Sequence, residues 1–375
     1  MPKKLSEPAK GRKEVVYVAK PDLPPLDEVV ASLQRLWDSR ILTNAGPNVE
    51  RFEKELQSFL GAKHVDVTVN GTLALQLALH TLPRRGEVIT TPFTFAATTT
   101  ALLWEGFLPR FADVNPRTFN LNADSANRLV NKNTVAILPV HVFGNPTGAN
   151  DLAHLGHELG IPVIFDAAHA FGVTVRGRSV LRLGSISTLS FHATKAFHTF
   201  EGGGLVTNSA SLSRKIRLLR NFGITDEEHV EIPGINAKMN EFCAVMGILN
   251  LKHFPKWQNQ RSRLYKMYID LLGHCGKLDF QSIPTEGYNY SYMPVIFADR
   301  RQRDYVHDRL VASGIKPRKY FFPATNDLSM QGFSSRDSTP VARNISLRIL
   351  TLPLYASLEE EIVDNICDIV LQALS

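Results

Sequence analysis

The sequence is poor in cysteine and contains no long apolar run. Cys243, Cys275 and Cys367 are far apart and none belongs to a Cys-x-x-Cys pair, which excludes a disulfide framework and gives no sign of a structural zinc site. No segment reaches the roughly 18 apolar residues that a membrane-spanning helix requires. The opening MPKKLSEPAKGRK is basic, but no apolar segment of a signal peptide follows it. We therefore expect a cytoplasmic protein with no bound metal.

The net charge is also small outside the first residues. The net charge of the chain is +6, of which residues 1 to 13 supply +4 through five basic residues and one glutamate. We interpret residues 1–19 as a flexible, solvated basic arm, with contact to nucleic acid or a membrane as the alternative. Nothing else combines basic residues with interleaved aromatics. With 44% hydrophobic and 21% charged residues, the composition is that of a folded globular protein and excludes general disorder.

Strand-like and helix-like segments alternate through the first two thirds of the chain. Short apolar, β-branched segments lie at 64–69, 87–91, 134–140, 162–166 and 187–191. Segments with helical spacing lie at 49–61, from 71 onward, and at 96–105, 151–159 and 210–221. Such alternation predicts an α/β fold with a mostly parallel sheet flanked by helices.

The remainder of the chain has a different pattern. A long helical segment at 240–272 precedes a strand at 292–298 and helices at 301–313 and 358–374, which predicts a small α+β domain. We place a large domain at 20–254 and the small C-terminal domain at 255–375. The alternative is that the first 45 residues also pack against the small domain.

Polar residues that directly follow strands are the first candidates for a site, because parallel sheets bind ligands beyond the carboxyl ends of their strands. Gly71 and Thr72 follow one strand and open a helix, where free amides and the helix dipole favour a phosphate. Asp166 ends another strand, where a carboxylate could pair with a cationic ring nitrogen, and His169 could bind the same ligand. Each also has a structural explanation: a helix cap, an ion pair or an ordinary buried polar residue.

The segment SFHATKAFHTFEGGG at 190–204 is the most unusual in the chain. Lys195 lies among apolar and small residues, with no acidic residue in the ten positions before it. Desolvation lowers the pKa of an amine and makes it a Schiff-base nucleophile, although an isolated lysine is more often a surface residue. Ser190 could donate to a phosphate, and Phe95 could lie flat on an aromatic ligand or belong to the core. Together these features describe a pyridoxal phosphate site.

The motifs also resemble those of a known family. The sequence is similar, from about residue 20 to its end, to the DegT/DnrJ/EryC1/StrS sugar aminotransferases, which are fold type I pyridoxal phosphate enzymes. The segments that carry the resemblance are ILTNAGPNVERFE, VNGTLALQLAL, VITTPFTFAAT, PVHVFGNPTG, FDAAHAFG, SFHATKAFHTFEGGGLV, GINAKMNEF, PRKYFFP and LRILTLPLY.

The resemblance implies a role for each candidate residue. Lys195 would bind the cofactor covalently, Asp166 would pair with the pyridinium nitrogen, and Phe95 would stack on the ring. His169 would lie near the ring hydroxyl, while Gly71, Thr72 and Ser190 would hold the phosphate. Asn236 would reach the phosphate from a neighbouring subunit, which implies a homodimer with shared sites. These assignments concern the residues Lys195, Asp166, Phe95, His169, Gly71, Thr72, Ser190 and Asn236.

The resemblance also suggests a substrate. FHATKAFHTFEGG and KPRKYFFPAT are most similar to members that aminate C4 of a TDP-linked 4-keto-6-deoxy hexose, with glutamate as donor, as in O-antigen or lipopolysaccharide biosynthesis. Lys238, Arg318, Tyr320, His192 and His198 are candidate substrate contacts, and the first three could equally be plain surface residues. The alternatives are a 3-keto or a UDP- or GDP-linked substrate, and a regulator that binds the cofactor without turnover.

Overall fold

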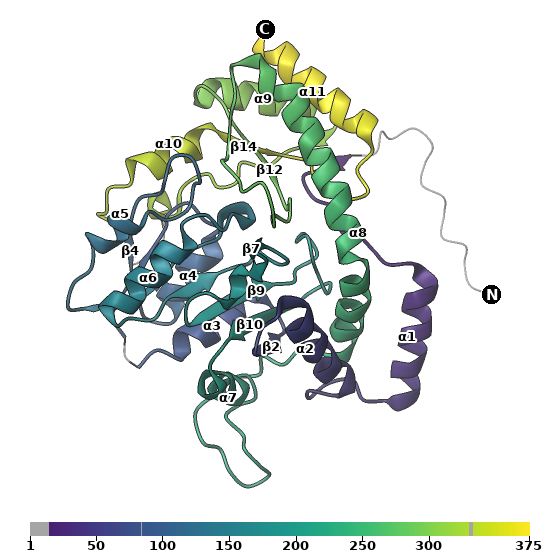
Figure 1. The fold of residues 1–375 in the computed structure, drawn as a ribbon, viewed down its shortest axis with the longest axis vertical. Coiled ribbons are helices and arrows are strands. Elements are labelled where there is room, and N and C mark those ends of the chain that lie inside the picture. The colour runs from purple at the N-terminus through teal and green to yellow at the C-terminus, as the bar shows by residue number, and fades with distance from the viewer. Residues whose placement is uncertain (1–14, 84, 330–332) are drawn as a thin grey trace.

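In the computed structural model, which describes residues 15–83, 85–329 and 333–375, a large sheet forms the centre of the N-terminal part (Figure 1). A parallel three-stranded sheet and a four-stranded sheet are joined through the parallel bridges Ile137–Val163 and Val140–Asp166. In spatial order the strands are β4 (Leu108–Phe111), β3 (Glu87–Thr90), β5 (Thr134–Leu138), β6 (Ile164–Asp166), β9 (Ile186–Ser190), β10 (Gly203–Thr207) and β2 (His64–Thr68). The predicted α/β fold with a mostly parallel sheet is confirmed.

Strand β10 is an element that the sequence pattern did not predict. It pairs antiparallel with both β9 and β2, and it begins with Gly203 and Gly204, which have little strand propensity of their own. A Cβ atom on Gly203 would lie 2.4 Å from the carbonyl oxygen of Asn70. Close approach to the turn after β2 therefore explains the glycine, and pairing with two neighbouring strands overrides its weak propensity.

Helices cover both faces of this sheet. They are α2 (Pro47–Leu60), α3 (Gly71–His80), α4 (Ala96–Trp104), α5 (Ala123–Asn127), α6 (Ala149–Leu159) and α7 (Ala210–Leu219), and the short hairpin β7 (Thr174–Val175) and β8 (Arg178–Ser179) lies beside them. α2 buries Phe52, Leu56 and Leu60 at helical spacing. It ends at Gly61, whose φ of +58° favours glycine. The interiors on the two faces are separate apolar clusters, built around Phe52 and around Leu75.

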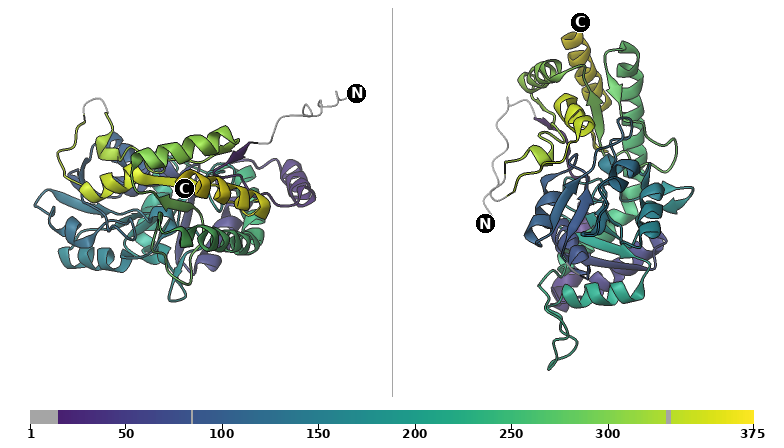
Figure 2. Two further views of the ribbon diagram at one scale, coloured as in Figure 1. Left: turned by 90° about the horizontal axis from the view of Figure 1, so that it is seen from above. Right: turned by 90° about the vertical axis from the view of Figure 1, so that its left-hand side faces the viewer.

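Helix α8 (Glu241–Leu272) links this part to the C-terminal part (Figures 1 and 2). Phe254 and the residues before it pack in the core of the large sheet, whereas Leu264 and Tyr268 pack in the C-terminal core. The C-terminal part of the chain contains β11 (Asp279–Phe280), β12 (Met293–Ile296), β13 (Ile315–Lys316), β14 (Ile349–Leu352), α9 (Arg300–Ala312), α10 (Pro340–Arg348) and α11 (Glu360–Leu374). Residue 255, the boundary expected from the sequence, thus falls inside one continuous helix.

The N-terminal segment differs from the expected arm of residues 1–19. Residues 1–14 lie outside the described residues, but β1 (Val16–Tyr17) pairs in parallel with β13. The backbone oxygen of Val18 accepts from the amide of Leu354 at 3.1 Å, and Asp22 forms a buried ion pair with Arg261. The first residues after 15 therefore pack with the C-terminal part. Helix α1 (Leu26–Ser39) then runs beside α8.

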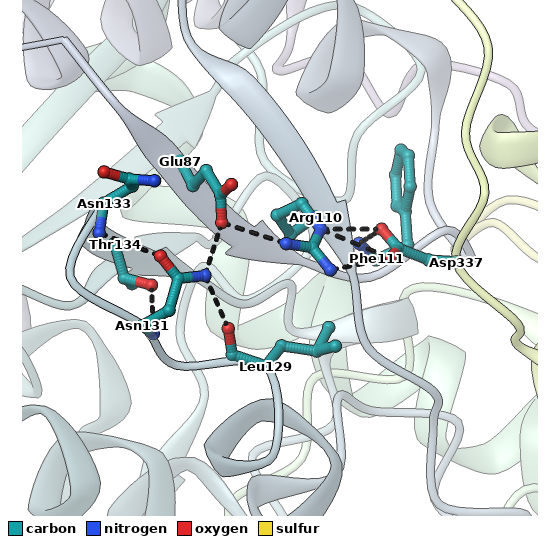
Figure 3. Close-up of polar contacts among 8 residues, drawn as sticks. All are labelled: Glu87, Arg110, Phe111, Leu129, Asn131, Asn133, Thr134 and Asp337. Carbon is teal, nitrogen blue, oxygen red and sulfur yellow. Dashed lines mark hydrogen bonds and ion pairs between the residues drawn. The ribbon is translucent and has the colours of Figure 1, made fainter.

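Polar contacts also tie Asp337 and the start of α10 to the large sheet. Asp337 accepts from the Arg110 guanidinium and from the amide of Phe111 at the edge strand β4 (Figure 3). Glu87 accepts from the same guanidinium at 3.0 Å. Asp113 accepts from the first free amides of α10. Among the helices in the described ranges, none has both the length and the apolar character needed to cross a membrane.

Candidate active site

The turn between β2 and α3 creates an anion-binding geometry. The side chain of Asn70 caps α3 by accepting from the amide of Leu73 at 2.8 Å, which leaves the amides of Gly71 and Thr72 at the helix N-terminus. Ser190 ends β9 directly beside this turn, because a Cβ atom on Gly71 would lie 2.7 Å from the Cβ atom of Ser190. A helix N-terminus and a hydroxyl thus face the same space.

Asp166 lies at the carboxyl end of β6, where it is only 5% exposed. One of its carboxylate oxygens accepts from Thr98 Oγ1 at 2.7 Å, and the other accepts from the amide of Ala168 at 3.1 Å. Burial raises the pKa of Asp166, while Thr98, Ala168 and the charge of Lys195 act in the opposite direction. The site therefore holds a buried acid close to a partly buried base.

Lys195 is the partly buried base. Burial lowers the pKa of its amine, and Asp166 and Tyr320 only partly oppose that effect. Its Nζ lies 3.5 Å from the hydroxyl of Tyr292, which comes from the segment before β12 in the C-terminal part. A buried amine with a lowered pKa has the properties of a carbonyl-attacking nucleophile.

His169 and Phe95 lie on the same cavity. The His169 ring stacks with Phe143, its Nδ1 accepts from the amide of Phe143 at 3.3 Å, and burial holds its pKa well below the usual range, so the ring is neutral at pH 7. Phe95 directly precedes the first turn of α4 and is 58% exposed, so it is not the core residue that was the alternative interpretation.

These residues surround one cavity of about 360 Å³. Ten of the predicted site residues line it, namely Gly71, Thr72, Phe95, Asp166, His169, Ser190, His192, Lys195, Arg318 and Tyr320. They come from strand ends and helix starts of the large sheet and from the loop after β13, so the fold brings together residues nearly 250 positions apart. Arg318 and Tyr320 also line a second cavity of about 500 Å³ that shares Phe95 with the first.

Three predicted residues lie outside the cavity. His198 is 1% exposed, and its Nε2 lies 2.9 Å from the backbone oxygen of Asp22. The structure does not bring His198 to the cavity, because the loop after Lys195 turns this side chain toward the N-terminal segment. Asn236 bridges to Asn221, and Lys238 donates to Asn221 at 2.7 Å and lies 4.7 Å from the centre of the Phe222 ring. Neither lines the cavity of its own chain.

The structure also adds residues that sequence reasoning missed. Thr98 contacts Asp166, and Tyr292 contacts Lys195, although neither follows a strand in the sequence. Thr98 belongs to the threonine-rich segment TPFTFAATTT, which was a signal for polar groups near Phe95. No local pattern identifies Tyr292, which reaches the cavity only because the two parts of the chain pack together. Glu201 lines the mouth and lies 3.4 Å from His192.

The donor set fits pyridoxal phosphate. The phosphate requires amides and a hydroxyl, the aldehyde a nucleophilic amine, and the ring nitrogen a carboxylate. All of these groups line one cavity in this structure. The geometry therefore provides a place for each functional part of that cofactor.

Comparison with known proteins points in the same direction. The sequence is 36% identical over 365 residues to dTDP-4-amino-4,6-dideoxy-D-glucose transaminase of Escherichia coli, covering 96% of this chain and 98% of the relative. It is 37% identical over 356 residues to the transaminase of the same name from Shigella dysenteriae, covering 94% and 97%. The crystal structure of DesI with its TDP-sugar product superimposes with a TM-score of 0.91 at 34% identity, covering 96% of this chain and 93% of DesI.

The family model covers nearly the whole described chain. It is that of the DegT/DnrJ/EryC1/StrS aminotransferase family, and it matches residues 26–371. The matched range includes every residue of the cavity described above. The chain therefore belongs to this family of sugar aminotransferases, and its cofactor is pyridoxal phosphate.

Proposed function

We propose that this protein transfers the amino group of L-glutamate to C4 of a dTDP-linked 4-keto-6-deoxy sugar, with dTDP-4-dehydro-6-deoxy-D-glucose as the lead substrate. The observation that carries the proposal is the similarity to two dTDP-4-amino-4,6-dideoxy-D-glucose transaminases over almost the full length of both chains. The likeness to DesI, a protein solved with a TDP-sugar, supports the same substrate class.

Each site residue has a separate proposed role in transamination. When bound, pyridoxal phosphate supplies an electron-accepting ring that allows an amino group to pass between two carbon skeletons. Gly71, Thr72 and Ser190 would hold its phosphate, and Asp166 would keep its ring nitrogen protonated. Phe95 would lie on the ring face and His169 near the ring hydroxyl. The residues proposed to hold the cofactor are Gly71, Thr72, Phe95, Asp166, His169, Ser190, Lys195 and, from a second subunit, Asn236.

Lys195 is the proposed proton carrier. It would hold the cofactor covalently, and its amine, once released, would move the proton at the reacting carbon of the substrate. The lowered pKa leaves more of this amine uncharged and able to accept a proton. The hydroxyl of Tyr292 at 3.5 Å provides a polar contact that keeps the released amine beside the cavity.

Arg318 is a proposed contact for the diphosphate of the nucleotide. It lies where the two cavities meet, so a sugar beside Lys195 and a nucleotide in the second cavity would place a diphosphate near its guanidinium. Tyr320 lines the same junction, and its ring centre lies 5.6 Å from the Arg318 guanidinium carbon. His192, at the mouth, is a further proposed substrate contact. Binding energy from the remote nucleotide would fix which sugar carbon lies beside Lys195.

A homodimer with shared sites is part of the proposal. The segment between α7 and α8 projects from the body in Figure 1 and carries Asn236 and Lys238. It also exposes apolar side chains, including Phe222, Val230 and Ile235. Exposed apolar residues that gather on one segment are typical of interaction surfaces, which supports burial of this segment against a second chain. We assign the protein to the cytoplasm, where it would supply an amino sugar for O-antigen or lipopolysaccharide synthesis.

The test is a matched substrate panel. Protein, cofactor and glutamate are incubated with 3-keto and 4-keto 6-deoxy sugars linked to TDP, UDP or GDP, and the products are identified by NMR. We expect amination at C4 of the TDP-linked 4-keto sugar, and none with Lys195→Ala. Preference for a 3-keto, UDP or GDP compound would replace the substrate. Cofactor binding without turnover of glutamate or of any sugar would support a regulator instead.

A further inference from the structure

We infer that Thr94 and Thr98 form a hydrogen-bond relay that positions Asp166 for the ring nitrogen of the cofactor. This inference rests on the proposed function of Asp166. It assigns to two threonines a role in the site that neither their sequence pattern nor the expected cofactor contacts include. Both are positioning residues, because they act through the carboxylate.

The distances fix the direction of the relay. Thr98 Oγ1 lies 2.7 Å from Asp166 Oδ2, and Thr94 Oγ1 lies 2.8 Å from Thr98 Oγ1. An ionised carboxylate can only accept, so the single hydroxyl proton of Thr98 points to Asp166. Thr94 must then donate its own proton to Thr98. Each donation polarises the next hydroxyl, which strengthens the final bond to the carboxylate.

The start of α4 holds the two hydroxyls in place. Thr98 lies in the first turn, where its amide donates to the backbone oxygen of Phe95 at 3.2 Å. Thr94 precedes the helix, and its hydroxyl reaches that of Thr98, which contacts Asp166 at the end of β6. Thr94 and Thr98 are 3% and 1% exposed, so water does not compete for these bonds. The relay is therefore built into the same element that presents Phe95 to the cavity.

The second carboxylate oxygen is fixed independently. The amide of Ala168 donates to Asp166 Oδ1 at 3.1 Å. Donors on both oxygens define the plane of the carboxylate, and the remaining lone pairs are left for a cation in the cavity. Hydrogen bonds to the charged form also oppose the effect of burial, which raises the pKa of Asp166. The two donors therefore orient the acid and partly offset the effect of burial before any ligand arrives.

The test measures cofactor binding rather than turnover. Pyridoxamine 5′-phosphate lacks the aldehyde and forms no covalent bond with Lys195, so its dissociation constant reports the non-covalent contacts. We expect Thr98→Val to weaken its binding about 10- to 100-fold, the effect of one hydrogen bond to a charged group. Thr98→Ser should restore binding to within a few-fold of wild type. Thr94→Val should have a smaller effect, because it removes only the outer hydroxyl.

Two controls separate positioning from packing. Thr100 lies on the exposed side of the same helix and donates only to helix carbonyls, so Thr100→Val should bind the ligand as wild type does. An analogue with CH in place of the ring nitrogen has no proton to share with Asp166. Its binding should be equally weak in wild type and Thr98→Val. The relay would be overturned if Thr98→Val weakened the binding of both ligands equally, or if it did not weaken the binding of pyridoxamine 5′-phosphate.

The proposed role of Asp166 is tested separately. Asp166→Asn should weaken binding of pyridoxamine 5′-phosphate and make the additional Thr98→Val change less harmful, because the amide is a neutral acceptor. If Asp166→Asn binds as tightly as wild type, the role of Asp166 in the proposed function is wrong. If Asp166→Asn weakens binding and Thr98→Val does not, the relay alone is wrong. Thermal melting of each variant verifies that it folds.

Discussion

At the scale of single residues, burial shifts the pKa values of the two central groups of the site in opposite directions. It lowers the pKa of the Lys195 amine and raises the pKa of the Asp166 carboxyl, so each group is pushed toward its neutral form. Their mutual attraction acts against this in both cases. The hydroxyl of Thr98 and the amide of Ala168 add two donors on the acid. The site thus combines a reactive amine with an acid that its neighbours help to stay charged.

Replacing Lys195 by alanine should abolish transamination. No other described lysine lines the cavity, so nothing replaces its amine. We expect a rate at least a thousandfold below wild type, equivalent to about 4 kcal/mol of lost barrier stabilisation. The absorption band of the lysine-linked cofactor should disappear as well. A variant that keeps more than a thousandth of the rate would contradict the assignment.

The buried charge of Asp166 should make the stability of the cofactor-free fold depend on pH. Because burial raises its pKa above the ordinary range of an aspartate, the folded protein without cofactor binds this proton more tightly than the unfolded chain. The stability from that proton is fully present below the unfolded pKa and is lost as pH rises through the folded pKa. After cofactor removal, Asp166→Asn should therefore melt no lower than wild type at pH 7, and its relative stability should fall toward pH 5.

The same variant should lose most of its transaminase activity, because asparagine cannot keep the ring nitrogen protonated. Asp308→Asn, at an exposed aspartate that contacts His307, is the matched control for the melting curves. A lower melting temperature for Asp166→Asn at pH 7 would show that the carboxylate stabilises the empty site. In that case its hydrogen bonds outweigh the effect of burial.

At the scale of elements, the turn between β2 and α3 is pressed against the end of β9. Gly71 has no room for a side chain, because the Ser190 backbone and side chain lie within 2.7 to 3.1 Å of the position that a Cβ atom would take. Gly203 on β10 meets the same turn from the other side, where Asn70 and the amide of Gly71 lie close. These two contacts fix the helix N-terminus that is proposed to bind the phosphate.

Gly71→Ala should therefore weaken cofactor binding with little loss of folded protein. The added methyl group must displace Ser190 or the start of α3, and overpacking of this kind costs about 1–3 kcal/mol. We expect the dissociation constant of the cofactor to rise at least about tenfold. Gly273→Ala is the control, since a Cβ there meets nothing nearer than 3.9 Å. Equal affinity of the two variants would show that the turn can relax.

The edge strand β4 provides a second test at this scale. Asp337 accepts from both the Arg110 guanidinium and the Phe111 amide, and its side chain is 13% exposed (Figure 3). Asp337→Ala should lower stability by about 1–2 kcal/mol, because the amide loses its partner and Arg110 keeps only Glu87. Asp308→Ala, at an exposed aspartate, should lower it far less. Thermal melting of the two variants measures the difference, and identical curves would remove Asp337 from the contacts that stabilise the fold.

At the scale of the whole molecule, sharing of sites between subunits makes a specific prediction. An Asn236→Ala/Lys238→Ala double variant and Lys195→Ala should each be inactive, or nearly so, alone. After exchange of subunits, a mixed dimer contains one site with Lys195 from one chain and Asn236 and Lys238 from the other. With equal amounts, about half of the dimers are mixed and about a quarter of the wild-type rate should return. No recovery after verified exchange would count against shared sites.

Much of this molecule follows from local sequence patterns. The periodic segments predict β2, β3, β5, β6 and β9 and most of the helices around them to within a few residues, but not β4 or β10. Ten of the predicted site residues line the cavity. Gly71, Asp166 and Lys195 were recognisable because parallel strands place their carboxyl ends at one edge. These residues reach one edge of the sheet once the strands and helices follow one another in the predicted order. The sequence alone therefore determined the fold class and predicted the cofactor, and it proposed residues that the fold gathers around one cavity.

The tertiary structure decided what depends on long-range packing. The glycine-rich β10 exists because two strands pair with it, and β1 exists because β13 lies beside it. His198 faces the N-terminal segment instead of substrate. Thr98 and Tyr292 reach Asp166 and Lys195 across 68 and 97 positions, respectively. Periodicity describes a segment's own conformation, but which side chains meet is set by how distant elements close around a common core.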